Sequence, residues 1–207
     1  MFSVITHEIR WFYPGEIPAA LYDWHKGLDG LYQQHETRTD LYLLLSGNAD
    51  QGIKYREGRI EVKKRLADLG LVRTSSATGN AELWKKWSFK TEKGEHSFNP
   101  GLFDPENWIG VRKKRYLQLF AFDQNNELML HPGIFGEGET VMVELSDVEF
   151  NENHWWTLGI EFTVQHSDTK TNSHDLVNRL LADFPDLKLD ALASFGYPQW
   201  LTVRFKT

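Results

Sequence analysis

Short runs of apolar, β-branched and aromatic residues, separated by polar residues and by Gly and Pro, recur along this chain and predict β-strands. These runs predict strands over residues 2–13, 40–45, 84–90, 111–122, 139–150, 155–164 and 201–205, and a β-hairpin over 52–65. A helical period occurs around residues 21–31 and again from Ser173, a residue type suited to an N-cap. We also expect a short helical turn through Leu69 that ends at Gly70, and a loop over 91–109.

The composition supports a packed core, because 41% of the 207 residues are hydrophobic and 14% are aromatic. With no repeat and no linker long enough to divide domains, we expect one domain. The chain has no Cys, which excludes disulfides and thiolate metal sites. Its first residues lack the segments of a signal peptide, and no stretch reaches the ~20 apolar residues of a membrane span. These features predict a cytoplasmic protein without a membrane partner.

Charge is distributed unevenly along the chain. The formal net charge of −6 argues against a general nucleic-acid binder. Residues 52–65 and 111–115 are nevertheless strongly basic, while 137–154 is acidic. Within 52–65, Glu57-Gly58 predicts a two-residue turn, because Gly accepts the positive φ that such a turn needs. This register places Arg56 opposite Arg59 and Lys54 opposite Glu61.

The predicted hairpin has one cationic face, because cross-strand partners project to the same side. That face carries Lys54, Arg56, Arg59, Glu61, Lys63 and Arg65. The wet face of a half-buried antiparallel sheet shows the same alternation, and from the hairpin alone this alternative stays open. A solvated face usually mixes charges, however, and like charges directly opposite each other repel. The sign bias therefore favours a face that an anion neutralises.

Taken in chain order, several segments resemble the CYTH superfamily of triphosphate tunnel metalloenzymes. The segment Thr6-His7-Glu8-Ile9-Arg10 is similar to the opening Glu-x-Glu-x-Lys strand of that family. Further similar segments are Asp40-Leu41-Tyr42, Lys54-Tyr55-Arg56, Ile60-Glu61-Val62-Lys63, Lys113-Lys114-Arg115-Tyr116, Ser146-Asp147-Val148-Glu149, Gly159-Ile160-Glu161 and Gly196-Tyr197. The resemblance covers nearly the whole chain, and the order of the segments carries it.

The resemblance implies an α+β fold, in which residues 1–207 form a single CYTH-like domain built as a closed antiparallel β-barrel, or tunnel, with flanking helices. It implies that phosphate is bound by Arg10, Lys54, Arg56, Lys63, Arg65, Lys113 and Arg115. It also implies a divalent cation, Mg or Mn, held by Glu8 and Glu161. The chain departs from the family pattern where Thr6, Ser146 and Gly159 replace carboxylates, so a metal site here has fewer ligands than the family's.

These expectations predict that the protein binds a small-molecule polyphosphate or nucleotide. If the remaining carboxylates hold a metal, the chemistry is water attack on a terminal phosphoryl group, as in a triphosphatase; adenylate cyclase-type activity is less favoured. No residue is assigned as the catalytic base. One alternative is a polyanion-binding tunnel without catalysis that has lost its metal ligands. Another is an aromatic-rich β-sandwich that binds sugars or a partner protein, with the basic hairpin facing solvent. The sequence does not predict the oligomeric state.

Overall fold

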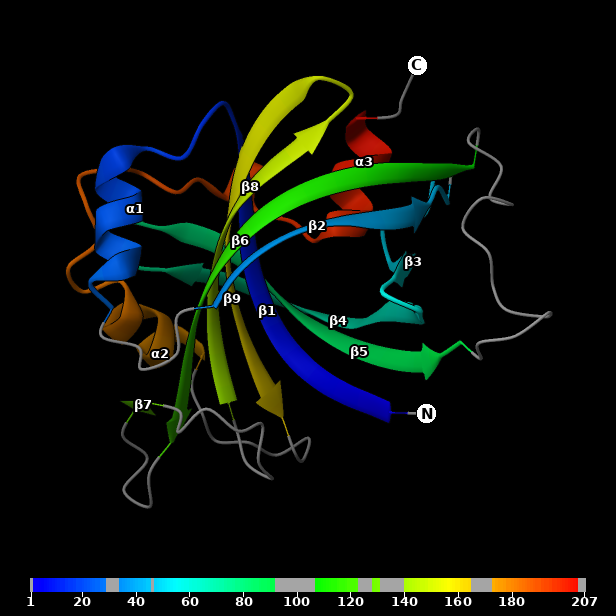
Figure 1. The fold of residues 1–207 in the computed structure, drawn as a ribbon. Helices are drawn as coiled ribbons and strands as arrows, with labels where there is room; N and C mark the ends of the chain where they lie inside the picture. The colour runs from blue at the N-terminus through cyan, green and yellow to red at the C-terminus, as the bar shows by residue number, and fades with distance from the viewer. Residues whose placement is uncertain are drawn as a thin grey trace.

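The computed structural model describes residues 2–28, 34–45, 47–91, 107–122, 128–130, 140–164 and 173–204. Eight antiparallel strands close into a barrel in the order β2-β3-β4-β5-β1-β9-β8-β6, and pairing of β2 with β6 completes the circle (Figure 1). The strands are β1 (Phe2–Pro14), β2 (Gln34–Leu43), β3 (Gln51–Arg56), β4 (Arg59–Arg73), β5 (Thr78–Lys90), β6 (Trp108–Phe122), β8 (Thr140–Phe150) and β9 (Asn153–Val164), with a short β7 (Leu128–Leu130) beside β6. The predicted α+β class and closed antiparallel barrel are confirmed.

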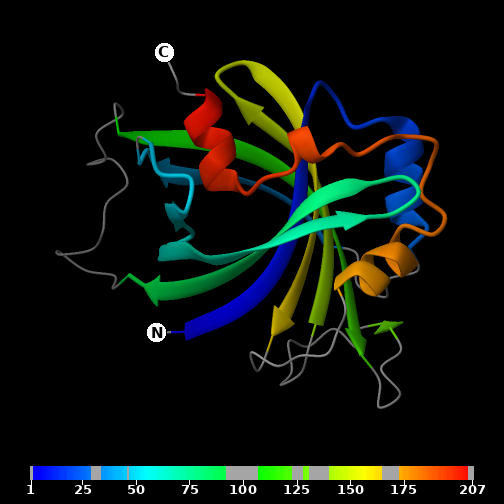
Figure 2. The same ribbon diagram turned by 180° about the vertical axis from the view of Figure 1, so that it is seen from behind.

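Two helices cover the outer wall of the barrel on one side. Helices α1 (Ala19–Lys26) and α2 (Ser173–Leu180) lie against the outward faces of β1, β8 and β9 (Figures 1 and 2). Outward residues such as Ile9, Val143 and Ile160 pack there against Leu21 and Leu176, all of them almost fully buried. The outward-facing apolar residues of these strands are buried in this core. The alternate residues of the same strands therefore face the barrel interior.

A third helix closes one end of the barrel. Helix α3 (Tyr197–Arg204) follows the short 3₁₀ helix η2 (Ala191–Ala193) and packs against a second apolar cluster (Figure 2). Trp200 is fully buried there, stacks on Phe12 at a ring distance of 5.1 Å, and meets Phe150 edge-on. The interior is therefore apolar at the α3 end and polar beyond it.

The prediction of a strand over 201–205 is wrong, because the described part of this segment, up to Arg204, belongs to α3. A strand would turn the consecutive residues Trp200 and Leu201 to opposite faces. In a helix they share a face with Tyr197, and this face packs on the apolar cluster. Burial thus overrides the β-branched character of Thr202 and Val203.

The predicted helical turn that ends at Gly70 is also wrong. Strand β4 continues to Arg73 and stays paired with β5, with register shifts between Arg65 and Ala67 and between Asp68 and Gly70. Each register shift changes the side to which the following side chains point. Leu66 and Leu69, at the two shifts, are therefore three positions apart, a spacing that is also found in helices. Most of the predicted loop over 91–109, residues 92–106, is outside the part of the chain that the structure describes. Its end is wrong, because Trp108 and Ile109 already belong to β6.

The hairpin predicted from Glu57-Gly58 is confirmed in its register. Arg56 pairs with Arg59 and Lys54 with Glu61, and both turn residues have positive φ, 47° for Glu57 and 72° for Gly58. Two positive φ values are those of a type I′ turn, whose twist matches the flanking strands. None of the described helices is long and apolar enough to span a membrane.

Candidate functional site

A cavity of about 120 Å³ lies inside the barrel between the α3 end and the β3–β4 hairpin. Its charged lining comes from all eight strands of the barrel. The cations are Arg10, Arg38, Lys54, Arg56, Lys63, Lys86, Lys113 and Arg115, and the carboxylates are Glu8, Glu61, Glu144 and Glu161. Six of the seven predicted phosphate-binding residues and both predicted metal ligands thus converge on one cavity. Arg65 does not line it, and instead pairs with Asp50 and Glu82.

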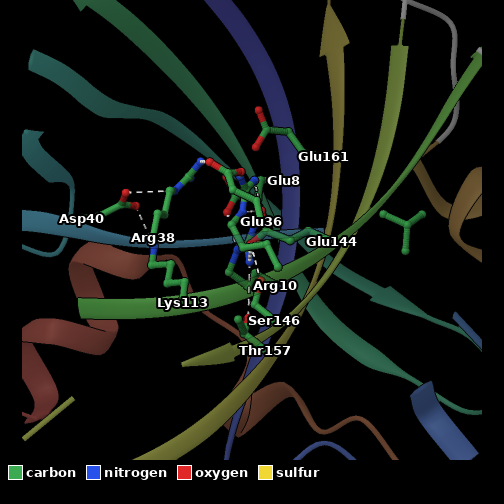
Figure 3. Close-up of polar contacts among 12 residues, drawn as sticks. Glu8, Arg10, Glu36, Arg38, Asp40, Lys113, Glu144, Ser146, Thr157 and Glu161 are labelled. Carbon is green, nitrogen blue, oxygen red and sulfur yellow. Dashed lines mark hydrogen bonds and ion pairs between the residues drawn. The ribbon is translucent and has the colours of Figure 1, made fainter. Parts of the chain in front are cut away.

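The deepest part of the site is an ion-pair network centred on Arg10 and Glu144 (Figure 3). Arg10 donates from Nε to Glu8 at 2.9 Å and from Nη1 to Glu144 at 2.8 Å. Arg115 donates to Glu144 as well, with an Nε contact of 2.9 Å, and its Nη1 reaches Glu36 at 2.9 Å. Burial raises the pKa of Glu144, but Arg115 and Arg10 outweigh it and hold the pKa well below its ordinary value. Both guanidiniums therefore stay charged in a buried setting.

Asp40 on β2 is a shared counter-charge for three cations, of which Figure 3 labels Arg38 and Lys113. Its side chain is completely buried, and its carboxylate lies 3.0 Å from Arg38 Nε, 3.2 Å from Lys113 Nζ and 3.4 Å from Lys54 Nζ. Lys113 also donates to Tyr42 Oη at 2.6 Å. Burial lowers the pKa of Lys113 well below its ordinary value, against the opposing effect of Asp40.

The two predicted metal ligands are bridged by a lysine. Lys63 Nζ donates to Glu8 and lies 3.9 Å from Glu161 Oε2, so its ammonium stands between the two carboxylates. Although burial opposes it, the charges of Lys63 and Arg10 lower the pKa of Glu8 to about 2. The described residues hold no group of three or more His, Cys, Asp or Glu that could bind a metal. The arrangement does not fit a preformed metal site, because a cation there would have to displace Lys63.

The hairpin contributes three of its five predicted cations, Lys54, Arg56 and Lys63, to the cavity lining. Lys54 and Arg56 both pair with Glu61, at 3.0 and 2.8 Å. Burial raises the pKa of Glu61, yet Lys54 and Arg56 bring it down to about 2. Lys86 lines the same cavity from β5 and forms no ion pair with any described residue. The lining cations outnumber the lining carboxylates by eight to four, and the ion-paired Asp40 and Glu36 reduce this difference to eight cations against six carboxylates. A smaller surplus of positive charge remains.

Tyr197 forms part of the cavity floor, where α3 presents it to two cations. Lys113 Nζ lies 3.6 Å from the centroid of its ring and Arg10 Cζ 5.2 Å from it. The hydroxyl oxygen is buried and has no hydrogen-bond partner among the described residues. Burial raises the pKa of Tyr197, so its hydroxyl keeps its proton and can donate.

Sequence reasoning missed Glu144, Arg38 and Tyr197 as site residues. For Glu144 a signal was present: Val141, Val143 and Leu145 face the helices, so alternation turns Glu144 inward. Arg38 was missed because the strand around it was predicted to start only at residue 40, whereas β2 begins at Gln34. Asp147, which belongs to one of the segments that resemble the family, lies on the outer wall beside Lys114.

Neither a scan against models of known protein families nor a search of curated proteins finds a match for this chain.

Proposed function

We propose that the barrel binds a condensed phosphate, inorganic triphosphate or a nucleoside triphosphate, inside its cationic cavity. One observation carries the proposal: cations from distant strands converge on a single enclosed space with fewer carboxylates than cations. Burying surplus charge of one sign is costly unless an opposite charge enters. A condensed phosphate supplies several negative charges and many acceptor oxygens in a narrow chain.

The donor types match such a ligand. Arg56 and Arg115 carry guanidiniums suited to forked contacts with phosphate oxygens, while Lys54, Lys63 and Lys86 act as compact point charges. Tyr197 adds a neutral donor at the cavity floor. The ordered resemblance to triphosphate tunnel metalloenzymes supports the same ligand class. The alternative of an open β-sandwich is wrong, because the strands close into a barrel and the hairpin cations line its cavity.

Binding is tested by isothermal titration calorimetry with tripolyphosphate and ATP, each with excess EDTA and then with Mg or Mn. Wild-type protein should bind in EDTA. Arg56→Gln should weaken binding about tenfold, since a charge-assisted hydrogen bond is lost. The matched control is Arg112→Gln, because Arg112 points outward from β6, is 63% exposed and pairs with Glu149. No heat for either ligand under any metal condition would overturn the proposal.

Metal-dependent hydrolysis is the second candidate function, and it requires a metal ion that displaces Lys63 from between Glu8 and Glu161. One observation favours it: the carboxylate of Glu161 faces the cavity, and its only described ion pair is the 3.9 Å contact with Lys63. Phosphate release from tripolyphosphate and from ATP, measured with Mg or Mn, tests this candidate. Activity that falls sharply in Glu161→Gln supports hydrolysis. If the purified protein releases no phosphate, and Glu161→Gln makes no difference, hydrolysis is excluded and the barrel is a binding tunnel without catalysis.

A further inference from the structure

Like charges face one another across the strands at the hairpin end of the barrel. Arg56 lies directly opposite Arg59 in the β3–β4 ladder. In the β4–β5 ladder, Arg59 lies opposite Lys90 and Lys63 opposite Lys86. Such pairs destabilise a sheet on their own. They become favourable when an anion lies between the paired cations, so their repetition at one end of the barrel indicates a ligand there.

Four of these residues form a continuous set, here called the mouth cations: Arg56, Arg59, Lys86 and Lys90. Arg56 and Lys86 already line the cavity. Arg59 and Lys90 form the last pair of the β4–β5 ladder, beyond the cavity lining. Arg59 Nε donates to Oγ of the buried Ser88 at 2.8 Å, which places Arg59 on the inward face. By alternation Lys90 shares that face.

The mouth cations are poorly neutralised within the described chain. Arg56 pairs with Glu61, but its Nε is buried and has no hydrogen-bond partner there. Arg59, Lys86 and Lys90 form no ion pair with any described residue. Glu61 is itself shared with Lys54. The mouth therefore offers several donors and charges that the described protein groups leave unused.

We infer that Arg59 and Lys90 form a second anion subsite, joined to the cavity through Arg56 and Lys86, for the outer phosphates of a linear condensed phosphate longer than triphosphate. This inference rests on the proposed function, since the inner phosphates would occupy the cavity. A nucleotide would instead place its base at the mouth. Among the described residues, the exposed ring beside Ser88 there is that of Phe2. The four mouth cations can bind further phosphates, whereas the single phenyl ring of Phe2 gives a base little to stack on. The composition of the mouth therefore favours phosphates over a base.

The test compares three ligands and two double variants by calorimetry in EDTA at fixed ionic strength. The ligands are tripolyphosphate, linear inorganic polyphosphate of medium chain length, and ATP. The mouth variant is Arg59→Gln with Lys90→Gln. Its matched control is Lys64→Gln with Lys85→Gln, which removes a like-charged pair from the same two strands but on the outward face.

The mouth variant should bind polyphosphate about tenfold more weakly than wild type, and tripolyphosphate within about twofold of wild type, because only the longer chain reaches Arg59 and Lys90. The control should bind both ligands like wild type. Equal losses for both ligands, or none, overturn the second subsite while leaving the proposed function intact. Tighter binding of ATP than of polyphosphate, lost in Phe2→Ala, also overturns it in favour of a base site. If wild type binds no condensed phosphate, the proposed function itself fails.

Discussion

Arg10 lies directly opposite Gly159 in the β1–β9 ladder, and its guanidinium fills the space that a side chain at 159 would take. A Cβ added to Gly159 would stand 2.5 Å from Arg10 Cζ, far inside van der Waals contact. The guanidinium joins Glu8 to Glu144 from this position. The deepest ion-pair network of the cavity thus forms only because position 159 on β9 is a glycine, which leaves room for the guanidinium of Arg10.

Gly159→Ala should therefore destabilise the protein by about 1–3 kcal/mol, the usual cost of overpacking a filled interior. The displaced guanidinium should also weaken tripolyphosphate binding. Urea denaturation and calorimetry measure the two effects. Gly110→Ala is the control, since a Cβ there meets its nearest neighbour at 3.4 Å. Equal stability of both variants would contradict this account of Gly159.

Asp40→Asn should destabilise the ligand-free protein by about 3–5 kcal/mol, because it leaves three buried or half-buried cations without their shared counter-charge. An anion in the cavity should compensate for part of that loss. Tripolyphosphate should then raise the melting temperature of the variant more than that of wild type. Thermal denaturation with and without the ligand measures this difference, and equal shifts would exclude coupling between Asp40 and the anion.

Stability should fall on acidification between about pH 4.5 and pH 2. The folded-state pKa values of Glu8 and Glu61 are lowered to about 2, so their contribution is present above the unfolded-state value and is lost as pH falls through the folded one. Glu61→Gln should reduce the slope of stability against pH in this range. Chemical denaturation across the pH range measures the slope.

Tyr197→Phe should change stability by less than about 0.5 kcal/mol, because the hydroxyl has no partner among the described residues. The same variant should bind tripolyphosphate several-fold more weakly, since it lacks the donor at the cavity floor. Tyr42→Phe is the contrasting variant, because its hydroxyl accepts from Lys113 at 2.6 Å and its loss should cost about 1–3 kcal/mol of folding stability. Unaltered binding by Tyr197→Phe would show that its hydroxyl does not contact the ligand.

The register of the β3–β4 hairpin could be predicted because its determinants are local. Glu57-Gly58 sets the turn, and alternation then assigns Lys54, Arg56 and Lys63 to one face. Alternation along β8 also determines that Glu144 points inward. To predict this from the sequence, however, one must know which face of the strand the helices cover. Spacing failed where bulges shift the strand near Gly70 and where burial of Trp200 and Leu201 makes a helix from residues with strand-like alternation.

The sequence by itself determined which side chains share a strand face, because that depends on the two-residue period of a β-strand and on one tight turn. Only the tertiary structure decided which faces meet. Arg10 and Glu144 are separated by 134 positions, and they pair because the strand order of the sheet places β1 and β8 on either side of β9. The order β4-β5-β1-β9 in the curved sheet likewise brings Lys63 between Glu8 and Glu161, so these carboxylates contact an ammonium. Such contacts depend on long-range strand pairing, which no local pattern of residues encodes.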